Sequence, residues 1–253
     1  MVRPLKRFFI SQTLGSQSKA VTLSESESHH LQNVLRLALG DNCLVFDAAG
    51  HEWTGSVVLD KTKHVQIKLL TEHQKKSVKL YYLAIAQAIP HRGKMDGLVE
   101  KAAELGIDSI IPMITERTIV RMSAANQSKA HMRWLKIIQE ARKQSHSDTL
   151  TEIVEPVDFH SVLERIQDQD AAFLFHPQAK QQITEVLSGL RSRLKEGAQT
   201  KITVLIGPEG GFTEGEMVKA SKKGMQSVRL GESILKADTA FIAIASMFQF
   251  GLS

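Results

Sequence analysis

The chain has 253 residues, of which 42% are hydrophobic and 23% are charged, and this balance excludes a disordered or collagen-like protein. Cys43 is the single cysteine, which excludes an intramolecular disulfide and a cysteine-rich zinc site and favours a reducing, cytoplasmic setting. The net charge of +5 gives a mild bias toward polyanions, and the sequence predicts neither a signal peptide nor a membrane-spanning segment.

The first seventy residues are dominated by short β-rich runs that turn signals separate. Strands are predicted at 7–10, 43–47, 53–59 and 64–70. One short helix is predicted over 28–37, because Leu31, Val34, Leu35 and Leu37 are apolar. This spacing indicates a small β-barrel or twisted sheet. The polar segment 72–77 separates it from the rest, so we expect domains 1–73 and 74–253.

Beyond this segment, predicted strands alternate with helices. Buried strands are predicted at 80–86, 109–114, 171–175, 202–206 and 227–230. A helix with apolar residues at helical spacing from Met95 to Leu105 should end at Gly106, in a left-handed cap. Residues 117–160 are expected to form a long helical excursion. The alternation favours an α/β domain whose parallel sheet is covered by helices on both faces.

A glycine-rich loop follows the strand that ends at Ile206. It spans 207–212, and Thr213 and Glu216 then form a predicted capping box that starts a helix ending near Gly224. Such a strand–loop–helix junction exposes backbone N–H groups at the sheet edge where α/β proteins bind ligands. The loop lacks the patterns of a phosphate loop and of a dinucleotide fingerprint. A plain structural turn is the alternative, and a second unusual loop nearby counts against it.

That second loop spans 230–238, again between a short strand and a helix. We expect Asp238 or a neighbour to cap the helix predicted over 239–250. This helix is apolar almost all round, so it should be buried on several sides. Burial against a second subunit is one explanation, and core packing is the other.

Both loops resemble those of the ribosomal RNA small subunit methyltransferase E family, the 16S rRNA uridine-N3 methyltransferases of the SPOUT class. The similarity rests on LIGPEGGFTEGE at 205–216 and on L-G-x-x-I-L-x-x-x-T-A at 230–240. Further matches, such as 7–9, 30–37 and 95–106, extend it over the whole chain. The resemblance implies an N-terminal PUA-like RNA-binding β-barrel and a C-terminal α/β domain with a deep trefoil knot.

The resemblance also implies a cofactor and partners. They are S-adenosylmethionine as methyl donor, 16S rRNA in the 30S subunit as substrate, and a second copy of the chain in a homodimer. No metal is expected, because the reaction requires none and no ligand cluster has metal spacing. The residues expected to hold the donor are Ile206, Gly207, Pro208, Glu209, Gly210, Gly211, Leu230, Gly231, Ile234, Leu235 and Ala240.

The acceptor nitrogen of a uridine must lose its imino proton before it can attack. Spacing does not identify the base, and Glu209 and Asp238 are candidates because they are acidic and lie in the loops. Basic residues are expected to contact RNA phosphates. These are Arg7, Arg36, Arg92, Lys94, Arg117, Arg121 and Lys236.

The sequence departs from the family pattern at several positions. Ser233 and Lys236 stand where the family usually has arginine, Asp238 replaces a glutamate, and segment 146–148 differs. Serine has neither the charge nor the planar fork of arginine. Two alternatives to a uridine-N3 methyltransferase of 16S rRNA remain, and the departures motivate the first of them. One is an RNA- or ribosome-binding paralogue with weak or absent catalysis, and the other is a methyltransferase with a different RNA target.

Overall fold

The computed structural model describes residues 5–10, 12, 14, 18–47, 51–60, 64–73, 79–91, 93–120, 122–145, 149–195 and 198–252. Arg92, Arg121 and segment 146–148, which carry predictions, lie outside these residues. The chain forms two compact units, Met1–Val78 and Lys79–Ser253, and each is described by itself. Within the described residues, every helix is too short or too polar to cross a membrane.

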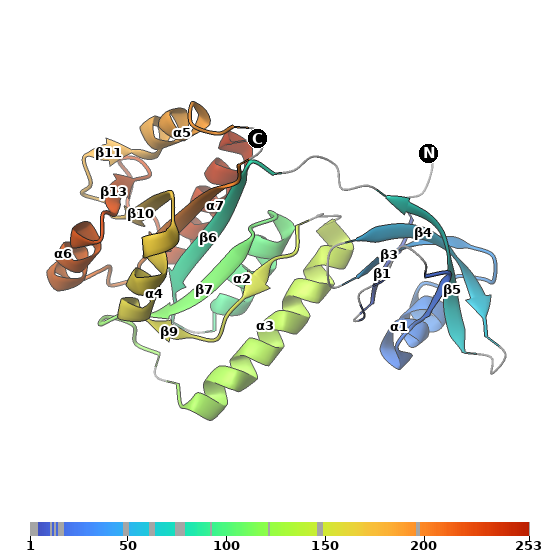
Figure 1. The fold of residues 1–253 in the computed structure, drawn as a ribbon. Coiled ribbons are helices and arrows are strands. Elements are labelled where there is room, and N and C mark those ends of the chain that lie inside the picture. Colours follow the sequence, from blue (N-terminus) through green and yellow to red (C-terminus); the bar gives the residue numbers. More distant parts are fainter. Residues whose placement is uncertain are drawn as a thin grey trace. The chain divides into compact units, whose positions relative to one another are not determined.

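In the first unit, the described strands form a five-stranded sheet in the order β1-β3-β4-β5-β2 (Figure 1). The strands are β1 (Arg7–Ile10), β2 (Ala20–Thr22), β3 (Asn42–Asp47), β4 (Glu52–Leu59) and β5 (Val65–His73). Helix α1 (Glu25–His29) continues into a π-helical turn, η1 (His30–Val34), which buries Leu31 among Phe8, Trp53 and Ile67. The predicted strands are confirmed, the short β2 was not predicted, and the helix begins and ends three residues early.

In the second unit, the described strands form an 8-stranded sheet in the order β11-β13-β10-β12-β6-β7-β8, with β9 also pairing with β7. Its strands are β6 (Tyr81–Ala88), β7 (Ser109–Ile114), β8 (Glu152–Ile153), β9 (Val157–Asp158), β10 (Ala171–Phe175), β11 (Gln181–Gln182), β12 (Thr200–Ile206) and β13 (Gln226–Arg229). Their pairings are parallel, as predicted. Parallel strands end at the same edge, so the loops after β10, β12 and β13 lie together.

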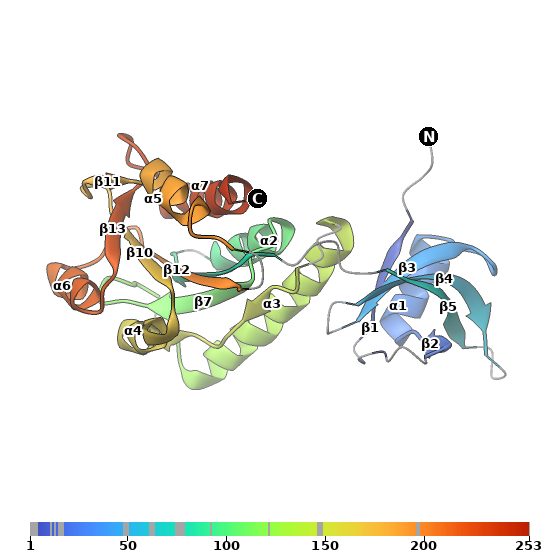
Figure 2. The same cartoon turned by 45° about the horizontal axis from the view of Figure 1, so that its top comes forward.

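Helices cover both faces of this sheet (Figures 1 and 2). They are α2 (Met95–Glu104), α3 (Ala124–Ser145), α4 (Phe159–Arg165), α5 (Ile183–Arg191), α6 (Glu214–Lys222) and α7 (Ala237–Gly251). Alternate residues of β6 serve the two cores. Leu83 and Ile85 pack with α2, α3, α5 and α7, whereas Ala84 and Ala86 pack with α4 and α6. The nearly continuous apolar run of β6 follows from this two-sided burial.

The segment 117–160 is only partly helical, which corrects the sequence prediction. Helix α3 packs Trp134 and Ile138 into the core, but β8, β9 and the start of α4 follow it within the same segment. Pro156 lies between β8 and β9, and proline both lacks an N–H and disfavours helix in the residue before it. At the end of α2, Gly106 adopts a positive φ of 69°, which confirms the predicted left-handed cap.

Candidate active site

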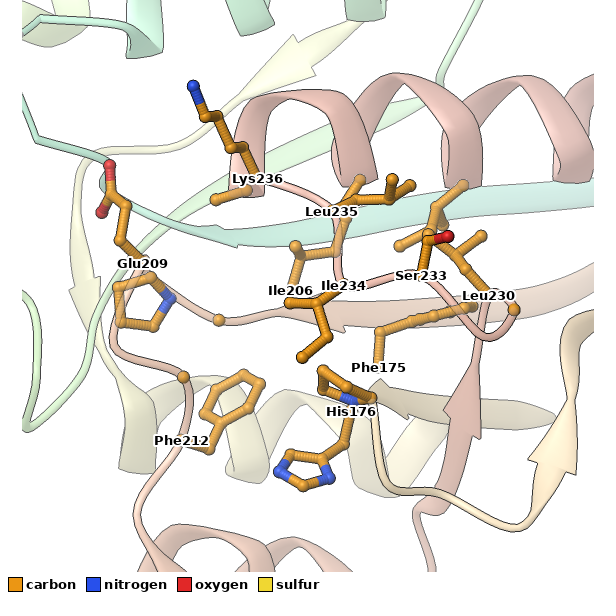
Figure 3. Close-up of a pocket in the computed structure, with 18 residues that line it drawn as sticks. Phe175, His176, Ile206, Glu209, Phe212, Leu230, Ser233, Ile234, Leu235 and Lys236 are labelled. Carbon is orange, nitrogen blue, oxygen red and sulfur yellow. The ribbon is translucent and has the colours of Figure 1, made fainter.

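A pocket with a volume of about 350 Å³ lies at the carboxyl ends of β10, β12 and β13 (Figure 3). Three loops, the strand ends before two of them and one helix supply its walls: residues 175–177 at the end of β10, 206–209 and 211–212 at the end of β12, 230–231 and 233–236 after β13, and Ala237, Ala240 and Ile244 of α7. The two loops that the sequence singled out therefore enclose one site, because their strands flank β10 on either side.

The structure brings together most of the residues predicted to hold the donor. Those that line the pocket are Ile206, Gly207, Pro208, Glu209, Gly211, Leu230, Gly231, Ile234, Leu235 and Ala240. Gly210 instead lies against Arg117, whose side chain would be 3.5 Å from a Cβ at this position. The pocket is also lined by residues that were not predicted to hold the donor: Phe175, His176, Pro177, Phe212, Ser233, Lys236, Ala237 and Ile244. The end of the predicted strand 171–175 was a usable signal for the first three.

The glycine loop is held in shape by its own backbone and by a buried ring. Gly211 adopts a φ of 68°, which favours glycine, and its N–H donates to the Pro208 carbonyl at 2.8 Å. The Phe212 ring is buried and lies 5.8 Å from the Phe159 ring. A Cβ on Gly207 would approach the Phe212 ring to 3.2 Å, so a larger residue at 207 would displace the ring.

The glycine loop is also bonded to the loop that follows β7. Glu216, only 1% exposed, accepts the N–H of Glu116 and the N–H of Thr213, both at 2.9 Å. The Thr213 hydroxyl oxygen accepts the Glu216 N–H, so the predicted capping box is present. Arg117 Nη1 donates to the Gly210 carbonyl at 2.8 Å and to the Phe212 carbonyl at 3.4 Å. These bonds fix one wall of the pocket.

The second loop and α7 expose apolar side chains. Ile234 is 82% exposed, and Leu235, Ile242 and Phe250 are exposed as well. Another side of α7 buries its aromatic and aliphatic residues, including Phe241, in the core. Within one chain, α7 is therefore buried along one side, and burial of its other sides by a second subunit stays a prediction. Exposed apolar side chains gathered on one loop and the helix that follows it are typical of binding sites and subunit contacts.

Both candidate bases are bonded to the loop that connects β6 to α2. Glu209 Oε1 accepts the His91 N–H at 3.1 Å, and Asp238 Oδ2 lies 2.7 Å from Lys94 Nζ. The hydrogen bond from Lys94 lowers the pKa of Asp238 below its usual value of 3.8, against the opposing effect of desolvation. The expectation that the side chain of Asp238 or a neighbour caps α7 is not met, since the N-cap is Lys236, which makes no side-chain capping bond, and Asp238 lies in the first turn.

The basic residues predicted to contact RNA occupy different environments. Arg7 is only 6% exposed, forms an ion pair with Glu52 and lies over the Phe46 ring. This burial corrects the prediction that Arg7 contacts RNA, because β1 turns its side chain into the unit. Arg36 is exposed and adopts a positive φ of 54°, which is rare for a residue with a long side chain.

Two family models match the chain. The model of the RNA methyltransferase domain matches residues 76–249, and that of the RNA methyltransferase PUA domain matches residues 23–70. The first match covers well over half of the chain. Together with a pocket at the carboxyl edge of a parallel sheet, it defines the chain as one of the RNA methyltransferases.

Curated relatives define the family more narrowly. Ribosomal RNA small subunit methyltransferase E of Bacillus subtilis is 30% identical over 93% of this chain and 93% of its own length. The protein of the same name from Synechocystis is 32% identical over 87% of this chain and 69% of its own length. The chain belongs to the ribosomal RNA small subunit methyltransferase E family, as the resemblance predicted.

Solved structures agree with this assignment. Ribosomal RNA small subunit methyltransferase E from Neisseria gonorrhoeae, bound to S-adenosyl methionine, shares 27% identity, with a TM-score of 0.81 over 96% of this chain and 97% of that one. A Legionella pneumophila structure, described as a methyltransferase with the bound cofactor SAM, shares 26% identity, with a TM-score of 0.82 over 98% of both chains. These matches confirm the predicted fold class, a PUA-like unit followed by a parallel-sheet methyltransferase unit.

Proposed function

We propose that this protein binds S-adenosylmethionine in the pocket and methylates N3 of a uridine in the 16S rRNA of the small ribosomal subunit. The observation that carries the proposal is that both loops of the family pattern form the walls of one pocket. The reaction would take place in the cytoplasm, where the 30S subunit is found.

The residues of the pocket fit such a donor. Gly211 and Gly231 line it, and a Cβ on either would meet nothing within 4 Å, so a ligand can approach the backbone closely. The volume and the mostly apolar walls are typical of small-molecule sites. S-adenosylmethionine, when bound, supplies a methyl group already activated by the sulfonium. The task of the chain is then to orient both reactants and to exclude water.

We propose Glu209, rather than Asp238, as the group that takes the imino proton of the uridine. Glu209 lines the pocket, whereas the Asp238 carboxylate is directed to Lys94. Glu209→Gln keeps an oxygen for the His91 N–H but removes the basic carboxylate. It should slow methyl transfer at saturating donor more than tenfold, with S-adenosylhomocysteine affinity unchanged within threefold. A rate equal to that of the wild type would exclude this role.

The remaining predictions belong to the same proposal. The PUA-like domain expected at 1–73 and basic residues of both domains would bind RNA, and the domain expected at 74–253 would carry the donor site and the trefoil knot. The basic residues are Arg36, Lys94, Arg117 and Lys236, together with Arg92 and Arg121. A homodimer would cover the exposed apolar surface formed by Ile234, Leu235, Ile242 and Phe250, hereafter the open patch.

One pair of measurements tests the proposal. Calorimetry should show binding of S-adenosylmethionine, and purified 30S subunits from cells lacking the gene should gain 3-methyluridine in 16S rRNA, detected by mass spectrometry. Ser233, which lines the pocket in place of the family arginine, favours the binding paralogue. Donor binding without methylation of 30S subunits or of other RNA would support that paralogue. Methylation of a different RNA would support the third hypothesis.

A further inference from the structure

His176 follows β10 directly and lines the pocket, although the glycine-loop motifs do not include it. Strand β10 lies between β12 and β13 in the sheet. The residue after its carboxyl end therefore stands between the two loops that form the walls. This position gives His176 access to a ligand held by either loop.

A backbone contact fixes the orientation and the tautomer of the His176 ring. The N–H of Gln178 donates to His176 Nδ1 at 3.3 Å. A neutral imidazole carries one N–H, so when Nδ1 accepts, the proton is on Nε2. Among the described residues the hydrogen bond of this ring is the one with Gln178, which leaves Nε2–H available to a ligand.

The surroundings of His176 make a hydrogen-bond donor there useful for recognition. Figure 3 shows its imidazole well apart from the Glu209 carboxylate and the Lys236 ammonium. Phe175 and Ile206, which also line the pocket, are buried and apolar. A few polar groups in a mostly apolar pocket determine how a ligand is oriented, because an unmatched polar group in such a site is unfavourable.

We propose that His176 donates a hydrogen bond from Nε2 to an acceptor atom of bound S-adenosylmethionine and so positions the methyl donor. This inference rests on the proposed function. It goes further by assigning a side-chain contact to a pocket whose other predicted contacts are made mainly by backbone. His176 then binds the methyl donor and takes no part in the transfer of the imino proton of the uridine.

Three substitutions separate this role from a structural one. In His176→Gln, the terminal amide can place an N–H near the position of Nε2. In His176→Asn, the shorter amide can keep an acceptor for Gln178 near the position of Nδ1, but nothing reaches the position of Nε2. His176→Phe keeps an aromatic ring at this position but has neither of the imidazole nitrogens. His160→Gln, on a side chain of α4 that is 78% exposed, is the matched control.

The probe is S-adenosylhomocysteine, titrated by calorimetry into the full-length protein, with a thermal melt to confirm that each variant folds. We expect His176→Asn and His176→Phe to bind about tenfold more weakly, which corresponds to about 1.4 kcal/mol, and His176→Gln and His160→Gln to stay within about threefold of the wild type. In 30S methylation, the two weak variants should raise the KM for the donor and leave kcat nearly unchanged.

Two results would overturn the inference while leaving the proposed function intact. One is equal affinity in all His176 variants. The other is rescue by asparagine but not by glutamine, which would show that the ring serves only the Gln178 N–H. If the wild-type protein itself fails to bind S-adenosylhomocysteine and S-adenosylmethionine, the proposed function fails, and this inference fails with it.

Discussion

The two walls of the pocket differ in how they are held. The glycine loop, 207–212, is fixed by the buried Glu216, by the guanidinium of Arg117 and by its own backbone. The loop at 230–236 instead exposes Ile234. A loop that is already fixed before binding loses little conformational entropy when a ligand binds. Exposed apolar side chains instead contribute favourable free energy when a ligand or a partner buries them. The glycine loop therefore determines the shape of the pocket, and the loop at 230–236 provides an apolar surface that a ligand or a partner can cover.

Removal of the buried carboxylate should damage the fixed wall most. Glu216→Ala removes a carboxylate that is 1% exposed and leaves the part-buried N–H groups of Glu116 and Thr213 without their acceptor. We expect a loss of about 3 kcal/mol in the free energy of unfolding of this unit, and a fall in Tm of about 6–12 °C in a thermal melt. Glu214→Ala, in the exposed first turn of the same helix, is the control and should shift Tm by less than about 2 °C. Equal shifts in both variants would show that the wall does not depend on this carboxylate.

Overpacking beneath the glycine loop should have the next largest effect, and we expect it to lower the affinity for the methyl donor. Gly207→Val places methyl groups where a Cβ alone would lie 3.2 Å from the Phe212 ring. Such crowding costs about 1–3 kcal/mol, so donor affinity measured by calorimetry should fall about 10- to 100-fold. Gly215→Ala, whose Cβ would meet only the Thr213 hydroxyl at 3.9 Å, is the control. Unchanged affinity in Gly207→Val would show that donor binding does not depend on the conformation of the glycine loop.

The fixed wall was also the part of the site that the sequence predicted best, for a local reason. Its strand, glycines and capping box are consecutive in sequence, so each signal confirms the next. The strands at 109–114 and 171–175 were predicted with the observed bounds for a similar reason, since each is an apolar run of ordinary strand length. Strands β8 and β9 have two residues each, which is too short for a side-chain periodicity to appear in the sequence.

What could not be predicted depends on contacts between distant segments. Arg7 looked like a surface cation, but β1 places it beside Glu52, which is 45 positions away in sequence. His176 enters the pocket only because β10 lies between β12 and β13 in the sheet. The roles of Glu209 and Asp238 in holding the β6–α2 loop likewise depend on partners more than a hundred residues away. The sequence offered these acids as candidate bases because they lie in the two loops, but it could not identify their partners.

The open patch should respond to substitution through association and not through folding. Ile234→Ser removes a large apolar side chain that one chain leaves exposed, so Tm at low protein concentration should change little. If a second copy covers the patch, self-association measured by sedimentation should weaken about tenfold, because burial of such a side chain contributes about 1.5–3 kcal/mol. Val218→Ser, at a 53% exposed position on α6, is the control. A wild-type monomer would contradict the dimer, and an unchanged dissociation constant in Ile234→Ser would show that the dimer forms through a surface other than the open patch.

The smallest expected effect concerns the ion pair that ties the start of α7 to the β6–α2 loop. Lys94 lowers the pKa of Asp238 in the folded state below its usual value of 3.8. The ion pair therefore stabilises the folded state above pH 3.8, and this stabilisation is lost as the pH falls through the lowered pKa of Asp238 in the folded state. Because both side chains are partly exposed, Asp238→Asn should reduce the free energy of unfolding by only about 0.2–1 kcal/mol at pH 7.

This pH dependence separates an ion pair from a simple packing contact. The difference between wild type and Asp238→Asn in urea unfolding should be constant from pH 8 to pH 5 and should shrink below about pH 4 and in 1 M salt. A double-mutant cycle with Lys94→Gln isolates the pair itself. A difference that persists at pH 3 would place the contribution of Asp238 in the first turn of α7, where its carboxylate oxygen also accepts the Thr239 N–H, and not in the bond to Lys94. The loop at 230–236 would then be held at its α7 end by the helix alone, and the β6–α2 loop would be held to the site by the bond from the His91 N–H to Glu209.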